Sequence, residues 1–245
     1  MFNSWDKTYR MYSWRVDLSH FGKAADYPGY FNRVITPVDI VTFENKFRTA
    51  IDDIGSFEIA GEVCFWKNYG NAHARNRVTQ KLLAHLRDPV NWNRFVRAVK
   101  QVSSDPCYDN FVALRDACYQ PREFATPITF LGFYKPTEYP MVDKHIANWW
   151  AVNRAKYGYE ASPKFSQRND GWIQTYTISQ NKQNWNAYVA WRRFCREYAI
   201  RMANNCGLNW RVRDVEMAVW EAQKNDISLE VLPQTHERAT SHNSG

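Results

Sequence analysis

Apolar residues recur three or four positions apart through much of the chain, which is the period of a helix buried on one face. In two neighbouring segments the pattern is carried by Trp92, Phe95, Val96, Val99, Phe111 and Leu114. It is longest from Asn184 to Met202, about five helical turns, so this segment is expected to be a central packing helix. The spacing predicts a mainly α-helical protein.

Local signals add boundaries to this pattern. A polar N-cap residue followed by proline is typical of a helix start, and it occurs at Thr36-Pro37, Asp88-Pro89 and Asp105-Pro106. Minor extended structure is expected at 8–16 and 172–178, where β-branched and aromatic residues alternate. We expect the early helices, over about 36–86, and the C-terminal helices to flank the middle of the chain and leave a cleft between two lobes.

A last helix is predicted near 210–223. Its inward face is expected to consist of Val212, Val215, Ala218 and Val219. The charged residues of this helix are Arg211, Arg213, Asp214 and Glu216. They are expected at the surface or in salt bridges that close the two lobes, and buried pairing is left open as an alternative.

Composition narrows the class of protein. The 245 residues carry a formal charge of +7, which favours a polyanionic partner. The five cysteines are odd in number and contain no CxxC pair, so we expect no zinc, no iron-sulfur cluster and no disulfide framework. Without a recognisable signal peptide or membrane span, the chain is expected to be a cytoplasmic monomer with no cofactor. Residues 1–233 should form one two-lobed domain and 234–245 a disordered tail.

Asp143 is the residue to which we assign the chemistry. It follows an apolar run punctuated by Pro136 and Pro140 and opens a helix that contains Trp149 and Trp150. An aspartate at this place also caps a helix in proteins without any activity, and the two roles are compatible.

The segment before Asp143 can be divided into a helix at 110–117, a tight connection at 118–122 and a second helix at 123–134. After it comes Val142-Asp143-Lys144-His145. Here the chain resembles the helix-hairpin-helix superfamily of DNA glycosylases, which set a hairpin against a DNA phosphate and carry a catalytic aspartate about 20 residues later. The resemblance implies a two-lobed helical fold with Asp143 at the cleft.

The chain departs from the family pattern at two points. The family's glycine-containing hairpin, Leu-Pro-Gly-x-Gly, is replaced by residues 119–123, Tyr-Gln-Pro-Arg-Glu, which offer no glycine for a positive φ. The lysine that bifunctional members carry is also missing, since Phe124 and Ala125 occupy its positions. Without a Schiff-base nucleophile, the resemblance implies hydrolysis that leaves an abasic site in an intact strand.

The activity implied is a monofunctional DNA glycosylase acting on a damaged or modified base that is flipped out of double-stranded DNA, in repair or in defence against phage. Asp143 would stabilise the oxocarbenium ion that forms as the base leaves. Candidate contacts to nucleic acid are Lys67, Arg75, Arg77, Arg122, Lys135, Lys144, His145 and Arg168.

A base pocket is suggested by aromatic rings next to amides, which can stack on a base and read its edge. The candidates are Trp66, Asn68, Tyr69, Asn71 and Gln167. An ordinary loop before a helix near Ala74 explains the first four equally well, and a simple turn at Asp170-Gly171 is favoured for the region of Gln167 and Arg168.

Two other functions stay open. One is a non-catalytic module that binds nucleic acid by shape, and the other is a hydrolase of free nucleosides or nucleotides. A pair of carboxylates for glycoside hydrolysis is less attractive, because Glu138 and Asp143 flank a proline turn and Glu138 is better explained as a loop residue.

Overall fold

The computed structural model describes residues 3–12, 16, 18, 21, 39–52, 57–69, 72–119, 124–162, 166–167, 173–174 and 182–233. This part of the chain is mainly helical, as the apolar spacing predicts. Thr36-Pro37, the polar tail, and most of 172–178 lie outside it.

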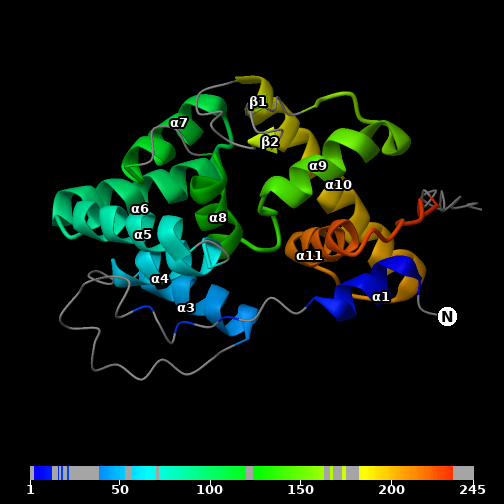
Figure 1. The fold of residues 1–245 in the computed structure, drawn as a ribbon, viewed down its shortest axis with the longest axis horizontal. Coiled ribbons are helices and arrows are strands. Elements are labelled where there is room, and N and C mark those ends of the chain that lie inside the picture. The colour runs from blue at the N-terminus through cyan, green and yellow to red at the C-terminus, as the bar shows by residue number, and fades with distance from the viewer. Residues whose placement is uncertain are drawn as a thin grey trace, which may run out of the picture.

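The helices fall into two groups (Figure 1). The first, the α3–α8 group, comprises α3 (Ile40–Asp52), α4 (Glu58–Lys67), α5 (Ala72–Leu86), α6 (Pro89–Ser104), α7 (Tyr108–Ala117) and α8 (Ala125–Tyr134). The second, the α9–α11 group, comprises α1 (Ser4–Met11), α9 (Lys144–Asn153), α10 (Lys182–Cys206) and α11 (Val212–Lys224), with the 3-10 helix η1 (Arg154–Tyr157) after α9. Within it, α11 packs against α1, α9 and α10.

Extended structure is limited in the described chain to two short strands. Strand β1 (Ser166–Gln167) pairs antiparallel with β2 (Ile173–Gln174). The strand expected at 172–178 is therefore present at 173–174.

The helix starts follow their capping residues. Asp88 caps α6 as predicted and accepts a hydrogen bond from the Val90 N–H at 2.8 Å. The predicted start at Asp105-Pro106 is wrong. Asp105 ends α6, where its own N–H donates to the Gln101 carbonyl, so α7 begins only at Tyr108. A residue that closes one helix is not in position to cap the next.

The strand expected at 8–16 is wrong over its first part, where the chain forms α1. Asn3 accepts a hydrogen bond from the Asp6 N–H at 2.9 Å and caps this helix. Trp5 and Thr8 are both buried and three positions apart, so the segment packs with a helical period. Alternating aromatic residues had concealed that period.

The α7–α8 hairpin occurs where the sequence places it, although residues 120–123 lie outside the described chain. Tyr119 takes a left-handed conformation with φ 53°, which is strained for a residue with a side chain. Its ring stacks on His85 with the centroids 5.1 Å apart. The turn thus adopts a positive φ without a glycine, with a ring contact in support.

Residues 135–143, the α8–α9 connection, run between the two groups of helices. The Tyr139 hydroxyl donates to the carbonyl of Ser103 at the end of α6, at 3.1 Å. The Lys67 ammonium group at the end of α4 donates to the Val142 carbonyl at 3.2 Å. The α3–α8 group therefore holds the connection at two points.

Helix α10 holds the same connection from the other side. The Tyr188 hydroxyl donates to the Pro140 carbonyl at 3.0 Å, and the Trp191 indole donates to the Met141 carbonyl at 3.1 Å. Because the polar backbone of this non-helical segment is buried, these side chains replace the hydrogen bonds that a helix would supply.

Gly132 on α8 lets the connection approach closely. A Cβ at this position would lie 2.8 Å from the Met141 Cγ, 3.3 Å from the Tyr139 carbonyl and 3.4 Å from the Arg213 Cδ. The first distance is too short for a real contact, so glycine is required here by space and not by backbone conformation.

Buried charges join the two groups. The Arg213 guanidinium of α11 is 0% exposed and its Nε lies 3.2 Å from a carboxylate oxygen of Glu44 on α3, which is 1% exposed. Arg213 also pairs with Glu216, and Arg211 pairs with both Glu44 and Asp214. The expected salt bridges between the two groups are present in the pairs of Arg211 and Arg213 with Glu44. The alternative of a surface position is wrong for Arg213, Asp214 and Glu216, which are all buried. Helical periodicity does not reveal a charged partner on a distant helix.

The Glu44→Gln substitution is expected to lower the free energy of unfolding by about 3 kcal/mol, because it leaves Arg213 buried with less compensating charge. Urea denaturation measures the change. Asp52→Asn is the control, since Asp52 pairs with Lys100 in an exposed position and its removal should cost less than about 1 kcal/mol. Equal effects of the two changes would contradict the role assigned to Glu44.

Candidate functional site

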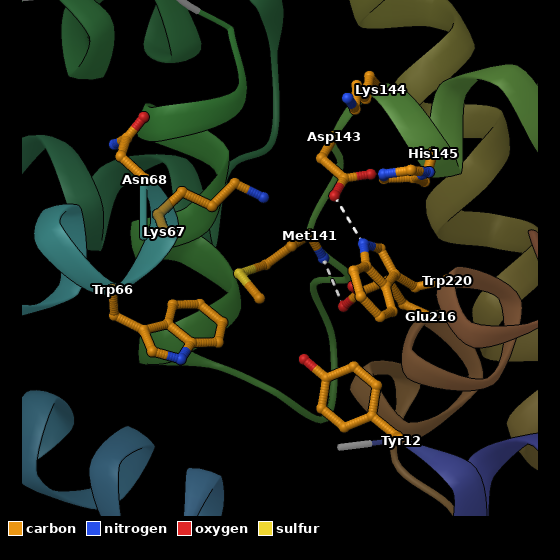
Figure 2. A pocket seen from close by; sticks show the side chains of 10 residues that line it. All are labelled: Tyr12, Trp66, Lys67, Asn68, Met141, Asp143, Lys144, His145, Glu216 and Trp220. Atoms are coloured by element: carbon orange, nitrogen blue, oxygen red, sulfur yellow. Dashed lines mark hydrogen bonds between the residues drawn. The ribbon is translucent and has the colours of Figure 1, made fainter. Parts of the chain in front are cut away.

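A pocket of about 480 Å³ opens where the two groups of helices face each other (Figure 2). This volume is typical of pockets for small molecules. It is lined by Tyr12, Trp66, Lys67, Asn68, Met141, Asp143, Lys144, His145, Glu216 and Trp220. Residues from the start of the chain, the end of α4, the α8–α9 connection, α9 and α11 thus meet at one place.

Asp143 is held by two hydrogen bonds of different origin. One carboxylate oxygen accepts the Ile146 N–H of its own helix at 3.0 Å, so Asp143 is the N-cap of α9, as predicted. The other oxygen accepts the indole N–H of Trp220 on α11 at 2.8 Å (Figure 2). A carboxylate attached through one torsion is broadly free to rotate, and the second bond fixes its plane.

The Trp220 ring is held in place by contacts with three neighbouring side chains. The rings of Tyr12 and His145 meet it edge-on, with centroids 5.8 Å and 5.6 Å away. The ammonium group of Lys224 lies 5.0 Å from its ring centroid. Edge-on rings and a cation over the ring face are both favourable arrangements for an indole. The donor to Asp143 is therefore part of a packed aromatic cluster.

The wall opposite Asp143 comes from the end of α4. Lys67 reaches the Val142 carbonyl, and the Asn68 amide donates back to the Cys64 carbonyl at 2.8 Å. Trp66 is 2% exposed, and its indole N–H has no hydrogen-bond partner among the described residues. Burial of a donor without a partner costs about 1–3 kcal/mol.

The floor of the pocket consists of Tyr12, Met141 and Glu216. Burial raises the pKa of Tyr12 to about 12, with Asp143 and Glu44 adding to the effect and Arg213 opposing it, so the phenol keeps its proton at neutral pH. Glu216 accepts the Met141 N–H at 3.3 Å while it pairs with Arg213. The buried ion cluster therefore reaches the pocket.

Of the residues proposed from sequence, the structure brings one group together at this pocket: Trp66, Lys67, Asn68, Asp143, Lys144 and His145. Two others lie beside them without lining it. Arg75 covers the Phe65 and Tyr69 rings, with its guanidinium carbon 4.6 Å and 5.0 Å from their centroids. Arg75 and Tyr69 thus support the end of α4 beside the pocket.

Of the remaining proposed residues, the structure describes Arg77, Lys135 and Gln167. Arg77 is exposed on α5, and Lys135 donates to the Ser103 carbonyl at 3.3 Å and lies 3.5 Å from Glu138. Neither lines the pocket. Gln167 is in β1, while Asn71, Arg122 and Arg168 lie outside the described residues.

Four lining residues were not proposed from sequence: Tyr12, Met141, Glu216 and Trp220. Three come from α11 or from the end of α1, far from Asp143 in the chain. The sequence signal for this part of the pocket is Trp220, a large aromatic residue among small and charged residues of α11. Its position in the sequence does not indicate that its partner is Asp143.

Within the described ranges, no group of three histidine, cysteine, aspartate or glutamate side chains is placed to hold a metal ion. The same residues include no helix with the length and apolar character needed to cross a membrane.

Comparison of the chain with protein-family models, with curated proteins and with solved structures finds no match.

Replacing Asp143 separates its two hydrogen bonds. Asp143→Ala should destabilise the protein by about 1–2 kcal/mol through loss of the α9 cap. Asp143→Asn should cost less, because its amide oxygen can still accept the Ile146 N–H. In both variants the indole N–H resonance of Trp220, assigned by its loss in Trp220→Phe, should shift. An unchanged resonance would contradict the contact with Asp143.

Proposed function

We propose that the chain is a monofunctional DNA glycosylase, which hydrolyses the N-glycosidic bond of a damaged or modified base and leaves an abasic site. The observation that carries the proposal is a fixed carboxylate, Asp143, at the wall of a pocket of about 480 Å³. Loss of a base creates positive charge at the anomeric carbon, and a carboxylate already oriented beside that carbon stabilises it without reorganisation.

The chemistry balances with water as the second substrate. The bond between the sugar and the base breaks, the electron pair leaves with the base, and water adds to the anomeric carbon. One proton of that water is released and the base takes up a proton. Asp143 serves as the counter-charge to the oxocarbenium ion and as an acceptor that orients the water.

The charges around Asp143 suit a nucleic-acid substrate. Lys67 and Lys144 line the pocket together with His145, and the chain as a whole has a charge of +7. Lysines at the rim attract the phosphates on either side of an extruded nucleotide, while the pocket accepts its base. This arrangement favours a substrate in DNA over a free nucleoside.

The proposal is tested with duplexes that carry uracil, hydroxymethyluracil, oxoguanine or hypoxanthine, and with phage DNA that contains hypermodified bases. Hot alkali cleaves a strand at an abasic site, so a base-releasing enzyme gives strand breaks only after alkali. No break with any of these DNAs would overturn the proposal. Faster release from a free nucleoside than from DNA would instead identify a nucleoside hydrolase.

The Asp143→Asn variant should lower the rate of base release at least about 100-fold with little change in DNA affinity, because it removes the counter-charge and keeps the cap. Asp88→Asn is the matched control, since Asp88 caps α6 in the same way and does not line the pocket. A non-catalytic binding module would show no release from any variant, and Asp143→Ala would bind DNA as tightly as the unmodified protein or more tightly.

Trp220→Phe should slow single-turnover base release by about 10- to 100-fold, because a hydrogen bond to a charged group is lost and the carboxylate plane is no longer fixed. DNA affinity should change by less than about threefold. Trp210→Phe is the control, since Trp210 is also half-buried and packs on Tyr9 outside the pocket. A loss of affinity equal to the loss of rate would contradict a positioning role.

A further inference from the structure

Trp66 is the one tryptophan of the pocket with an unsatisfied donor. Trp220 donates to Asp143, whereas the Trp66 N–H meets no acceptor among the described residues. The Trp66 side chain is also fixed in place, since the Phe43 and Phe133 rings meet it edge-on at centroid distances of 6.4 Å and 5.2 Å. A fixed, buried donor without a partner is costly for the protein alone, so an acceptor on a ligand is the natural complement.

Two further donors accompany it. Lys67 follows Trp66 in the chain and lines the same pocket, and the Tyr12 hydroxyl points into the space in front of Trp66 (Figure 2). The phenol of Tyr12 keeps its hydrogen at neutral pH, as any tyrosine does, and burial raises its pKa further, to about 12. The indole and the ammonium group thus contribute donors from the α4 wall, and the phenol contributes one from the floor of the pocket (Figure 2).

The Asp143 carboxylate lies across the pocket from Trp66 and Lys67 (Figure 2). Figure 2 shows Asp143 and Trp220 on the wall formed by α9 and α11, facing Trp66 and Lys67 on α4, with Met141 between them. A nucleotide whose anomeric carbon lies at Asp143 would point the far edge of its base toward the donors. The chemistry of that edge then decides which bases fit.

We propose that Trp66 is a specificity-determining residue whose indole N–H donates to a carbonyl oxygen on the base, with Tyr12 as a second donor. The pocket therefore selects bases that present carbonyl oxygens on this edge over bases that present amino groups there. An amino group facing these donors would leave both partners without an acceptor and would be rejected.

This inference rests on the proposed function only in that the ligand is a base. Its test therefore measures binding and not hydrolysis. Uracil and cytosine form one matched pair of free bases, and hypoxanthine and adenine form another, since each pair exchanges a carbonyl for an amino group. Each is titrated into isotope-labelled protein while the indole N–H resonances are followed by NMR.

Uracil and hypoxanthine should bind about tenfold or more tightly than their amino counterparts and should shift the Trp66 resonance. Trp66→Phe should remove this preference, and Tyr12→Phe should reduce it without disturbing the aromatic packing. Trp92→Phe is the control for a buried tryptophan outside the pocket and should leave the preference unchanged. Thermal unfolding of each variant shows whether it remains folded.

Equal binding within each pair, preference for the amino bases, or no binding by any of the four bases would overturn the inference. A carbonyl preference that survives in Trp66→Phe would overturn the role of Trp66. Asp143→Asn should retain the preference. Selective binding by the unmodified protein, without release of a base from any of the DNAs, would refute the glycosylase and leave this inference standing. Base release from DNA without any carbonyl preference would support the glycosylase and refute this inference.

Discussion

The pairing of Glu44 with Arg213 is the interaction on which the arrangement of this protein depends. It joins α3 to α11 across the two groups of helices, where neither charge is open to water. Arg213 passes the constraint on to Glu216, whose carboxylate holds the Met141 N–H at the floor of the pocket. Charges buried in this way stabilise only one relative placement of their helices, since any shift would leave a charge without its partner.

Asp143 shows what that placement achieves. Its bond to the Ile146 N–H is local and would form in any helix that begins with aspartate. Its bond to the Trp220 indole exists only because α11 is docked against α9. The bond to Ile146 caps the start of α9, and the bond from Trp220 fixes the direction in which the carboxylate faces. Orientation of the Asp143 carboxylate is therefore a property of the assembled fold and not of the motif.

The parts of the fold that depend on neighbours in sequence could be predicted. Asp143 and Asp88 cap the helices that follow them, and the long apolar period of α10 marks a helix. The parts that depend on distant partners could not. The periodicity of α11 places Arg213 correctly on a helix, but only the presence of Glu44 on α3 explains its burial. Likewise, six of the ten residues that line the pocket could be predicted from the sequence around Trp66 and Asp143. Of the other four, Tyr12, Glu216 and Trp220 come from the end of α1 and from α11, which are distant in sequence.

Gly132 has a consequence for how this pocket can change. Its missing side chain is the space that Met141 occupies, so the depth of the pocket is set from behind, by a residue on α8 that does not line it. Even one added methyl group there would push Met141 into the pocket or displace the Arg213 stem. The size of the pocket is thus tunable from the interior of the protein, with every residue that lines it left unaltered.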